Sequence, residues 1–314
     1  MARVEKHIDR YLNQLDKVDL NEQEADATYI VDKLVWLKAR LAELKELKDK
    51  VEAHPDKQIS MTDPDSRLLK TTAMERKVCY NIQSAVDCKH HLIVAHEVTN
   101  TIDRNQLCRM GKQAQEALKN KDLTVLADKG YFSSKDIVDA QDAGMTPLVP
   151  SIDTSGSEKK GILNKSLFLY DAEKDRYICP AEKELIPRGL VTDKGLLYRS
   201  YNCSVKVCRE CKLKPMCNKN ATPRRIRRWE HADRIEAMTE LLESKPESMV
   251  IRRQTVEHPF GTIKLWMGAT HLLTRRFKGI SIEMDLHVLA YNLKRMISIF
   301  GVSGLIKALM SKSY

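Results

Sequence analysis

Several features that would set the class of this protein at once are missing from the sequence. No apolar run approaches the roughly 18 residues that a membrane-spanning helix needs. The first residues, MARVEKHIDRYLNQ, are charged and contain no apolar core, so we do not expect a secretory leader. No internal repeat or low-complexity tract stands out. We therefore expect neither a membrane protein nor a secreted protein.

Without a leader, the eight cysteines are expected in a reducing compartment. Disulfides are then not expected, and metal ligation or plain burial is the alternative.

The composition is that of a folded protein with an excess of positive charge. The chain has 314 residues, of which 42% are hydrophobic and 31% charged, enough for one large domain or two smaller ones. Lys and Arg number 53 against 43 Asp and Glu, a net charge of +10. Such an excess favours a polyanionic partner, nucleic acid before an anionic membrane.

Hydrophobic periodicity divides the chain into four segments and predicts an α/β fold. Residues 1–60 are predicted to be a helical N-terminal extension. Its apolar stripe at Ile30, Leu34, Leu37 and Leu41 favours a helix packed on its own protein. Residues 61–150 alternate strands and helices, residues 151–245 form an insertion with five of the eight cysteines, and residues 246–314 are helical.

Within 61–150 the pattern predicts strands and helices in alternation. The expected elements are a two-strand hairpin over 77–99, a helix over 103–119 capped by Asp103, a strand over 123–128 buried on both faces, a short helix from Ser133 to Gly144 and a strand over 146–150. Near the C-terminus an amphipathic helix is expected from Ile282 to Phe300, ended by Gly301.

Two aspartates lie where predicted strands end. Asp87 is on the polar face of the first strand of the hairpin, and Asp128 ends the run LTVLAD. For Asp128 alone, a cap on the turn at Lys129-Gly130 is the simpler reading. For two carboxylates on strands expected to be neighbours, a shared cation is favoured, because two-metal phosphoryl transfer needs carboxylates that converge on ions ~3.5–4 Å apart.

A third carboxylate comes from the segment SMVIRRQTVEHPFGTIKLW. In a helix, Arg253, Glu257 and Lys264 lie on one face. Pro259 is expected to kink or end this helix just past Glu257. A solvated ion pair between Arg253 and Glu257 explains the spacing equally well.

The cysteines of the insertion have the spacing of a metal site. Cys208-x2-Cys211 is a knuckle, Cys217 follows, and Cys179 lies upstream in YICP. Thiolates from separate chain segments hold structural Zn²⁺, and Cys203 is a rival ligand. Burial as small hydrophobic residues is the alternative.

The insertion also carries the basic run RRIRRWEH, residues 224–231. It places Arg224, Arg225, Arg227 and Arg228 beside Trp229, a composition suited to phosphate contact and base stacking. A solvated basic helix face with the tryptophan in the core explains the run as well.

These residues lie in segments that resemble the DDE transposases of bacterial insertion sequences. The segments are MTDPDSRLLK, YNIQSAVDCKHHLIVAHEVTN, VLADKGYFS, TVEHPFGTIKLWMG and LAYNLKRMI, and the resemblance runs from residue 61 onward. It points to the IS4-like group and, within it, to the IS1182 family. The family signature is tyrosine, arginine, glutamate and lysine. Arg253, Glu257 and Lys264 match it, whereas Val250 stands at the tyrosine position.

The resemblance implies an RNase H-like core, a mixed sheet flanked by helices, in which Asp87, Asp128 and Glu257 bind two Mg²⁺ ions, with Mn²⁺ as a substitute. Arg253 and Lys264 would contact the DNA backbone, and the four cysteines would hold Zn²⁺. In related enzymes a tryptophan of the insertion accepts a flipped base, which makes Trp229 a candidate for that role.

The implied reaction is hydrolytic nicking at the element end, followed by attack of the freed 3′-OH on target DNA. The expected partners are double-stranded DNA and a second subunit on that DNA, in the bacterial cytoplasm with the nucleoid. Relatives carry a longer N-terminal region that binds the element ends, so this chain alone is expected to recognise and cut them poorly. A non-catalytic DNA-binding relic is the main alternative, and the Arg–Glu–Lys signature argues against a host nuclease of RNase H-like fold.

Overall fold

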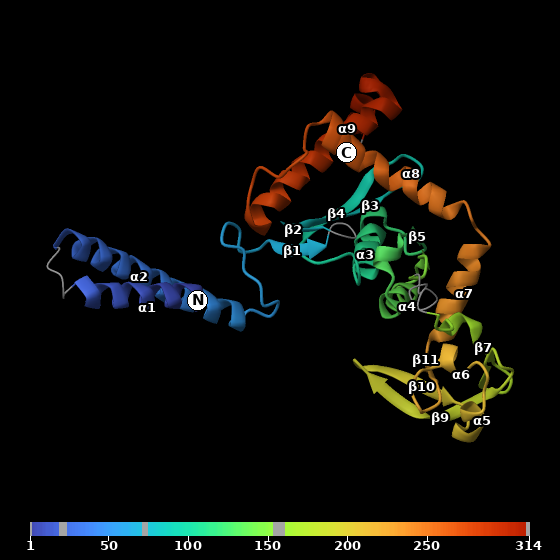
Figure 1. Ribbon diagram of the computed structural model, residues 1–314. Coiled ribbons are helices and arrows are strands. Elements are labelled where there is room, and N and C mark those ends of the chain that lie inside the picture. The colour runs from blue at the N-terminus through green and yellow to red at the C-terminus, as the bar shows by residue number, and fades with distance from the viewer. Residues whose placement is uncertain (1, 19–23, 71–74, 153–160, 312–314) are drawn as a thin grey trace. The chain divides into compact units, whose positions relative to one another are not determined.

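The computed structural model describes residues 2–18, 24–70, 75–152 and 161–311, as a mixture of helices and strands (Figure 1). The chain divides into two compact units. One comprises residues 1–81, 99–101 and 273–280, and the other residues 82–98, 102–272 and 281–314. No helix within the described ranges is both long and apolar enough to cross a membrane.

The first unit begins with a pair of helices, α1 (Ala2–Val18) and α2 (Glu24–Ala53), which lie side by side (Figure 1). Their core joins Ile8 of α1 to Ile30, Leu34 and Leu37 of α2. The predicted helical extension is therefore confirmed, and its apolar stripe packs within the same chain. A short antiparallel pair follows, β1 (Arg67–Lys70) and β2 (Arg76–Cys79).

The segment MTDPDS of this unit caps a helix more than 200 residues away. Helix α9 (Arg276–Ser311) begins with free backbone amides. The amide of Arg276 donates to Asp63 Oδ2 at 3.2 Å, and that of Phe277 donates to Asp65 Oδ2 at 3.1 Å. Carboxylates at a helix N-terminus also interact favourably with the helix dipole. The two aspartates thus tie the start of α9 to the loop before β1.

The second unit contains the predicted alternation of strands and helices. Its first elements are β3 (Asn81–Val86), β4 (Ile93–Thr99), α3 (Leu107–Leu118), β5 (Thr124–Leu126), η1 (Lys129–Tyr131), α4 (Ser134–Asp142) and β6 (Thr146–Leu148). The hairpin is confirmed as the pair β3–β4, and β5 pairs with β6 in parallel. Helix α4 begins after Ser133 and is followed by Gly144 with φ +85°, as predicted.

The cap predicted for α3 is wrong. The N-cap is Gln106 rather than Asp103, and its side chain makes no capping bond. The first amides of the helix, those of Leu107 and Cys108, donate instead to the buried carboxylate of Asp136 in α4, at 2.8 and 3.3 Å. A residue from a neighbouring helix therefore replaces the local cap.

The strands of the core do not form one sheet in the described residues. The pairs β3–β4 and β5–β6 are separate. The strands before Asp87 and Asp128 were predicted to be sheet neighbours, but no hydrogen bonds join them in the described ranges. A cavity of about 250 Å³ is lined by residues of β3, β5 and α3. Because β5 borders this space, Thr124 is exposed and Val125 and Leu126 are only half-buried, and the prediction of a strand buried on both faces is wrong.

The insertion is built on a five-stranded sheet with the order β11-β10-β9-β8-β7. Its elements are η3 (Lys165–Leu167), β7 (Leu169–Asp171), β8 (Arg176–Ile178), β9 (Glu184–Asp193), β10 (Leu196–Asn202), α5 (Val205–Arg209), α6 (Lys214–Cys217), β11 (Arg225–Trp229) and α7 (Ala232–Glu243). Helix α7 returns to the core, where Arg234 bonds to Gln141 and Met238 is buried.

Two long helices follow the insertion. Helix α8 (Ser248–Gly261) is continued by a π-helical segment, η4 (Thr262–Trp266). The helix does not end just past Glu257, because α8 continues through the fully buried Pro259 to Gly261. Helix α9 starts earlier than expected. Gly301 has non-helical backbone angles (φ 68°, ψ 163°) and separates two helices within the range Arg276–Ser311, so the first of them ends there as predicted.

Candidate active site

Asp87 directly follows β3 and closes the turn to β4. Its amide donates to the carbonyl of Leu92 at 2.9 Å, and its Oδ2 accepts the amide of His90 at 2.7 Å. The side chain is half-buried. One carboxylate oxygen is thus engaged in the turn, and the residue stands at a strand end as predicted.

Asp128 follows β5 and uses both carboxylate oxygens. Oδ1 accepts the amide of Gly130 at 2.8 Å, which caps the short helix η1. A Cβ at residue 130 would lie 2.9 Å from that oxygen, so the close approach favours glycine. Oδ2 accepts a bond from Arg252 Nη2 of α8, also at 2.8 Å. The capping role considered from the sequence is therefore confirmed, together with an ion pair that was not predicted.

The three signature residues on α8 and η4 face solvent. Arg253, Glu257 and Lys264 are all exposed. Arg253 and Glu257 are not recorded as an ion pair in the described structure, and Lys264 lies 5.8 Å from the ring centroid of Phe260. A solvent-facing cation and carboxylate remain available to a ligand.

The opposite face of α8 carries a residue that the sequence analysis missed. Arg252 shares a helical face with Thr255 and Pro259, both buried, and it reaches Asp128 across 124 residues of sequence. No local signal distinguishes Arg252 from Arg253 in the sequence, because adjacent residues of a packed helix can both face solvent, as Arg253 and Gln254 do.

Helix α8 is anchored a second time, near Asp87. His258 Nδ1 lies 2.9 Å from the hydroxyl of Tyr291 in α9, and that hydroxyl donates to the carbonyl of His91. The rings of His91 and His258 have centroids 5.0 Å apart. The helix with the signature therefore contacts both the turn after Asp87 and the loop of Asp128.

The described residues do not form an assembled metal site. Nowhere in the described ranges do three His, Cys, Asp or Glu side chains gather closely enough to hold a metal ion. The donors fit in kind, because Asp87, Asp128 and Glu257 offer the oxygen ligands that Mg²⁺ prefers. The positions of these three side chains do not suit a metal ion, because Asp128 forms an ion pair with Arg252 and Glu257 is exposed to solvent.

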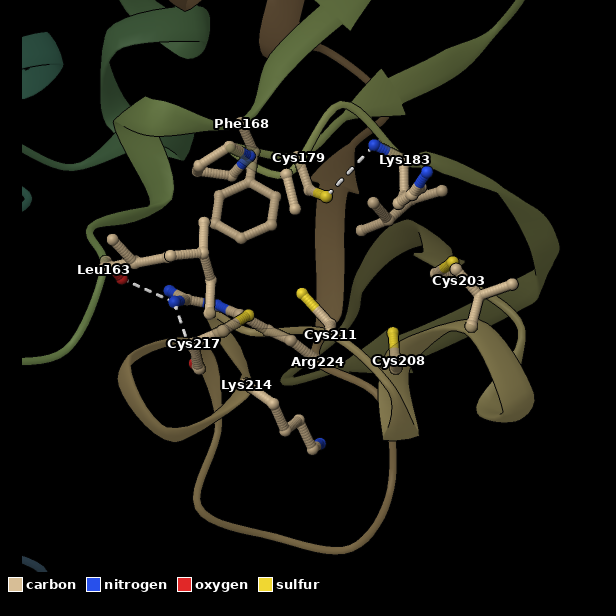
Figure 2. Close-up of a pocket in the computed structure, with 15 residues that line it drawn as sticks. Leu163, Phe168, Cys179, Lys183, Cys203, Cys208, Cys211, Lys214, Cys217 and Arg224 are labelled. Atoms are coloured by element: carbon tan, nitrogen blue, oxygen red, sulfur yellow. Dashed lines mark hydrogen bonds between the residues drawn. The ribbon is translucent and has the colours of Figure 1, made fainter.

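The cysteines of the insertion line a second, much smaller cavity of about 30 Å³ (Figure 2). Cys179, Cys203, Cys208, Cys211 and Cys217 contribute to it, so both the predicted ligands and their rival are present. The sulfur of Cys179 accepts the amide of Lys183 at 3.4 Å. Burial and the neighbouring thiol of Cys203 raise the pKa of Cys208 to about 11.

The remaining cysteines are scattered. Cys108 is buried in the core, Cys79 is half-buried and Cys88 is exposed. All eight cysteines are free in the described structure.

The basic run forms strand β11, not a helix, so alternate residues face opposite sides. Arg225 and Arg227 are exposed. Arg228 instead forms an ion pair with Glu236 and stacks on a tyrosine ring of the insertion sheet. Trp229 is 8% exposed, which is the core position considered as the alternative to base stacking.

Arg224, just before the strand, is an internal residue. It donates to the carbonyls of Leu163 and Cys217 and lies over the ring of Phe168 (Figure 2). Of the four arginines, Arg225 and Arg227 expose their side chains to a phosphate backbone, and Arg227 also forms an ion pair with Asp193 at 3.2 Å.

Comparison with protein families decides the identity. The model of the transposase DDE domain matches residues 57–293, about three quarters of the chain. The chain belongs to the DDE transposase family. This transposase is therefore an enzyme of a family that carries out metal-dependent phosphoryl transfer in DNA transposition, and the family implies an RNase H-like core. No curated protein and no solved structure matches the transposase chain significantly.

Proposed function

We propose that this transposase nicks DNA at the ends of an insertion sequence of the IS1182 family and joins the freed 3′-OH to target DNA. One observation carries the proposal. Helix α8, which bears the exposed residues Arg253 and Glu257, packs against the loop of Asp128 through Arg252. A segment with the family signature thus contacts a strand-end carboxylate that is 124 residues away from it in sequence.

Asp87, Asp128 and Glu257 are the residues that would hold the divalent ions, Mg²⁺ or Mn²⁺. Such ions lower the pKa of a water molecule and stabilise the leaving oxygen of a phosphodiester. Arg253 and Lys264 would hold the DNA backbone by charge-assisted bonds to phosphate.

The insertion would add further DNA contacts. Arg225 and Arg227 are exposed on β11 and suit phosphate binding. We retain Arg224, Arg228 and Trp229 as candidate DNA contacts only on the condition that DNA rearranges this sheet, because in the free protein all three are engaged or buried.

We also propose that the insertion holds one structural Zn²⁺ through Cys179, Cys208, Cys211 and Cys217. The support is that all four line one small cavity and come from two separate chain segments. Zinc requires thiolates. The raised pKa of Cys208 describes the protein without metal, and binding would release that proton.

We propose the same domain boundaries that the sequence analysis predicted. Residues 1–60 are the helical extension, 61–150 and 246–314 the catalytic core, and 151–245 the insertion. We propose that the enzyme acts in the bacterial cytoplasm with the nucleoid, where its DNA substrate would be found.

A second copy of the chain is the proposed partner on DNA. Ile282, Leu286, Leu289 and Leu293 of α9 are 44–62% exposed. They are four, three and four residues apart, the spacing of a two-helix coiled-coil seam. Such a seam is complementary to itself about a two-fold axis. We therefore propose α9 as a dimer contact.

The test is a nicking assay with supercoiled DNA that carries the element ends, in the presence and absence of Mg²⁺. Asp87→Asn, Asp128→Asn and Glu257→Gln should each abolish cleavage while circular dichroism stays unchanged. Glu243→Gln, an exposed carboxylate at the end of α7, is the control and should cut like the wild type.

Wild-type protein that binds DNA but never cuts it would favour the other reading, a non-catalytic relic. The absence of an assembled metal site in the described residues is the observation behind that alternative.

A further inference from the structure

We propose that Arg252 is a positioning residue that holds the carboxylate of Asp128 in the metal-free enzyme and must release it before Glu257 can complete a metal site. This inference rests on the proposed metal-binding role of Asp128 and Glu257. It assigns a function to an arginine outside the Arg253, Glu257 and Lys264 signature.

The arginine side of this contact is largely shielded from solvent, whereas the Asp128 side chain is 43% exposed. Arg252 Nη2 lies 2.8 Å from Asp128 Oδ2, and the arginine side chain is only 21% exposed. Charge-assisted bonds of this length are among the stronger hydrogen bonds in proteins. Since Gly130 occupies the other oxygen, both oxygens of Asp128 are committed. The guanidinium supplies the positive charge that a divalent ion would otherwise supply.

Helix geometry prevents Arg252 and Glu257 from approaching Asp128 at the same time. Five residues of α-helix turn the chain by about 500°, so the two side chains point about 140° apart around the axis. Arg252 shares the buried face with Thr255 and Pro259, whereas Glu257 is exposed. Bringing Glu257 to Asp128 therefore requires α8 to turn or bend, and that movement withdraws Arg252.

The packing of α8 against the core leaves room for such a movement. Arg252, Thr255 and Val256 line the cavity of about 250 Å³. Arg252 Nε and Ser84 Oγ are both buried with no hydrogen-bond partner in the described structure, and both residues border this cavity. Unpaired buried polar atoms destabilise an arrangement. The helix also runs directly into the π-helical segment η4, a feature frequent at functional sites.

The consequence is a competition between Arg252 and the metal for one carboxylate. Metal binding must break the ion pair in the wild type but not in a variant that lacks the guanidinium. Removing it should therefore tighten metal binding even in the absence of DNA. A residue with only a structural role would lower the melting temperature on removal and leave metal affinity unchanged.

The experiment titrates the full chain with Mn²⁺ and measures free Mn²⁺ by electron paramagnetic resonance, without DNA. Arg252→Gln should bind Mn²⁺ about tenfold more tightly than the wild type. Arg252→Lys, which keeps a charge but loses the planar fork, should fall between the two and serves as the folded variant if Arg252→Gln is unstable. Lys245→Gln removes a positive charge from an exposed side chain seven residues before Arg252 and should bind like the wild type.

Unchanged or weaker binding in both Arg252 variants would overturn the inference. So would an equal gain in Lys245→Gln, because the effect would then be one of net charge. Asp128→Asn separates the two proposals. If it binds Mn²⁺ as tightly as the wild type, the proposed metal role of Asp128 has failed. If it loses Mn²⁺ while Arg252→Gln gains nothing, only the role of Arg252 has failed.

Discussion

Replacing Asp63 with asparagine tests whether the loop before β1 holds the start of α9. Asp63 is 9% exposed and accepts three bonds. They come from the Tyr80 hydroxyl at 2.8 Å, the Asp65 amide at 3.3 Å and the Arg276 amide at 3.2 Å. Asparagine keeps one carbonyl oxygen and turns an NH₂ group toward one of these donors.

The expected cost follows from the bonds that are lost. A hydrogen bond to a charged group contributes about 1.5–3 kcal/mol, and an orphaned buried donor costs a similar amount. We expect Asp63→Asn to destabilise the docked loop by about 2 kcal/mol. Because 1.4 kcal/mol corresponds to a factor of ten, amides at the start of α9 should exchange roughly 30 times faster.

The assay is hydrogen exchange followed by mass spectrometry on a peptide that contains Arg276 and Phe277. Asp122→Asn, a change at an exposed aspartate, should leave the exchange of this peptide unchanged. Equal exchange in wild type and Asp63→Asn would refute the capping role.

The difference in stability between the wild type and Asp63→Asn should depend on pH. Burial alone would raise the pKa of Asp63, but bonds from Tyr80 and the amides of Arg276 and Asp65 hold that pKa below its ordinary value. The ionised carboxylate therefore contributes its stability above the ordinary aspartate pKa and loses it as the pH falls through the lowered value. The difference between wild type and Asp63→Asn should be full at neutral pH and vanish in strong acid.

The other predictions concern the insertion and α9. Cys211→Ser should lower the zinc content measured by elemental analysis, and zinc-free wild-type protein purified without chelator would contradict the site. Arg225→Ala should reduce the salt slope of log K for DNA binding by about 1, whereas Arg224→Ala should instead lower the melting temperature, because Arg224 bonds to two carbonyls inside the insertion. Leu289→Arg should keep the DNA complex at one copy of the chain in light scattering, with Leu190→Arg, an equally exposed leucine of β9, as the control.

Local patterns in the sequence determined many of the elements. The period of two around β3 and β4, the period of 3.6 in α3 and the stop at Gly144 each depend on neighbours within a few residues. The turn at Lys129-Gly130 predicted the cap at Asp128 in the same way. The cysteine spacing likewise identified residues that do line one cavity.

Local sequence patterns did not predict the long-range contacts. Nothing near Arg252 indicates that it, rather than Arg253, turns inward, because that choice depends on the loop of Asp128, 124 residues earlier. The same holds for Asp63, whose partner Arg276 is 213 residues away.

The hydrophobic periodicity alone did not decide whether some segments form a helix or a strand. The run 224–229 has too few apolar residues to separate strand from helix, and pairing with β10 makes it β11. Helix caps depend on whichever acceptor is nearest in space, and for α3 that is Asp136 rather than Asp103. The sequence by itself determined most of the helices and strands between residues 77 and 150 and the two aspartates that follow strands there. Only the tertiary structure decided which face of α8 meets Asp128, since that contact depends on packing between segments that share no local signal.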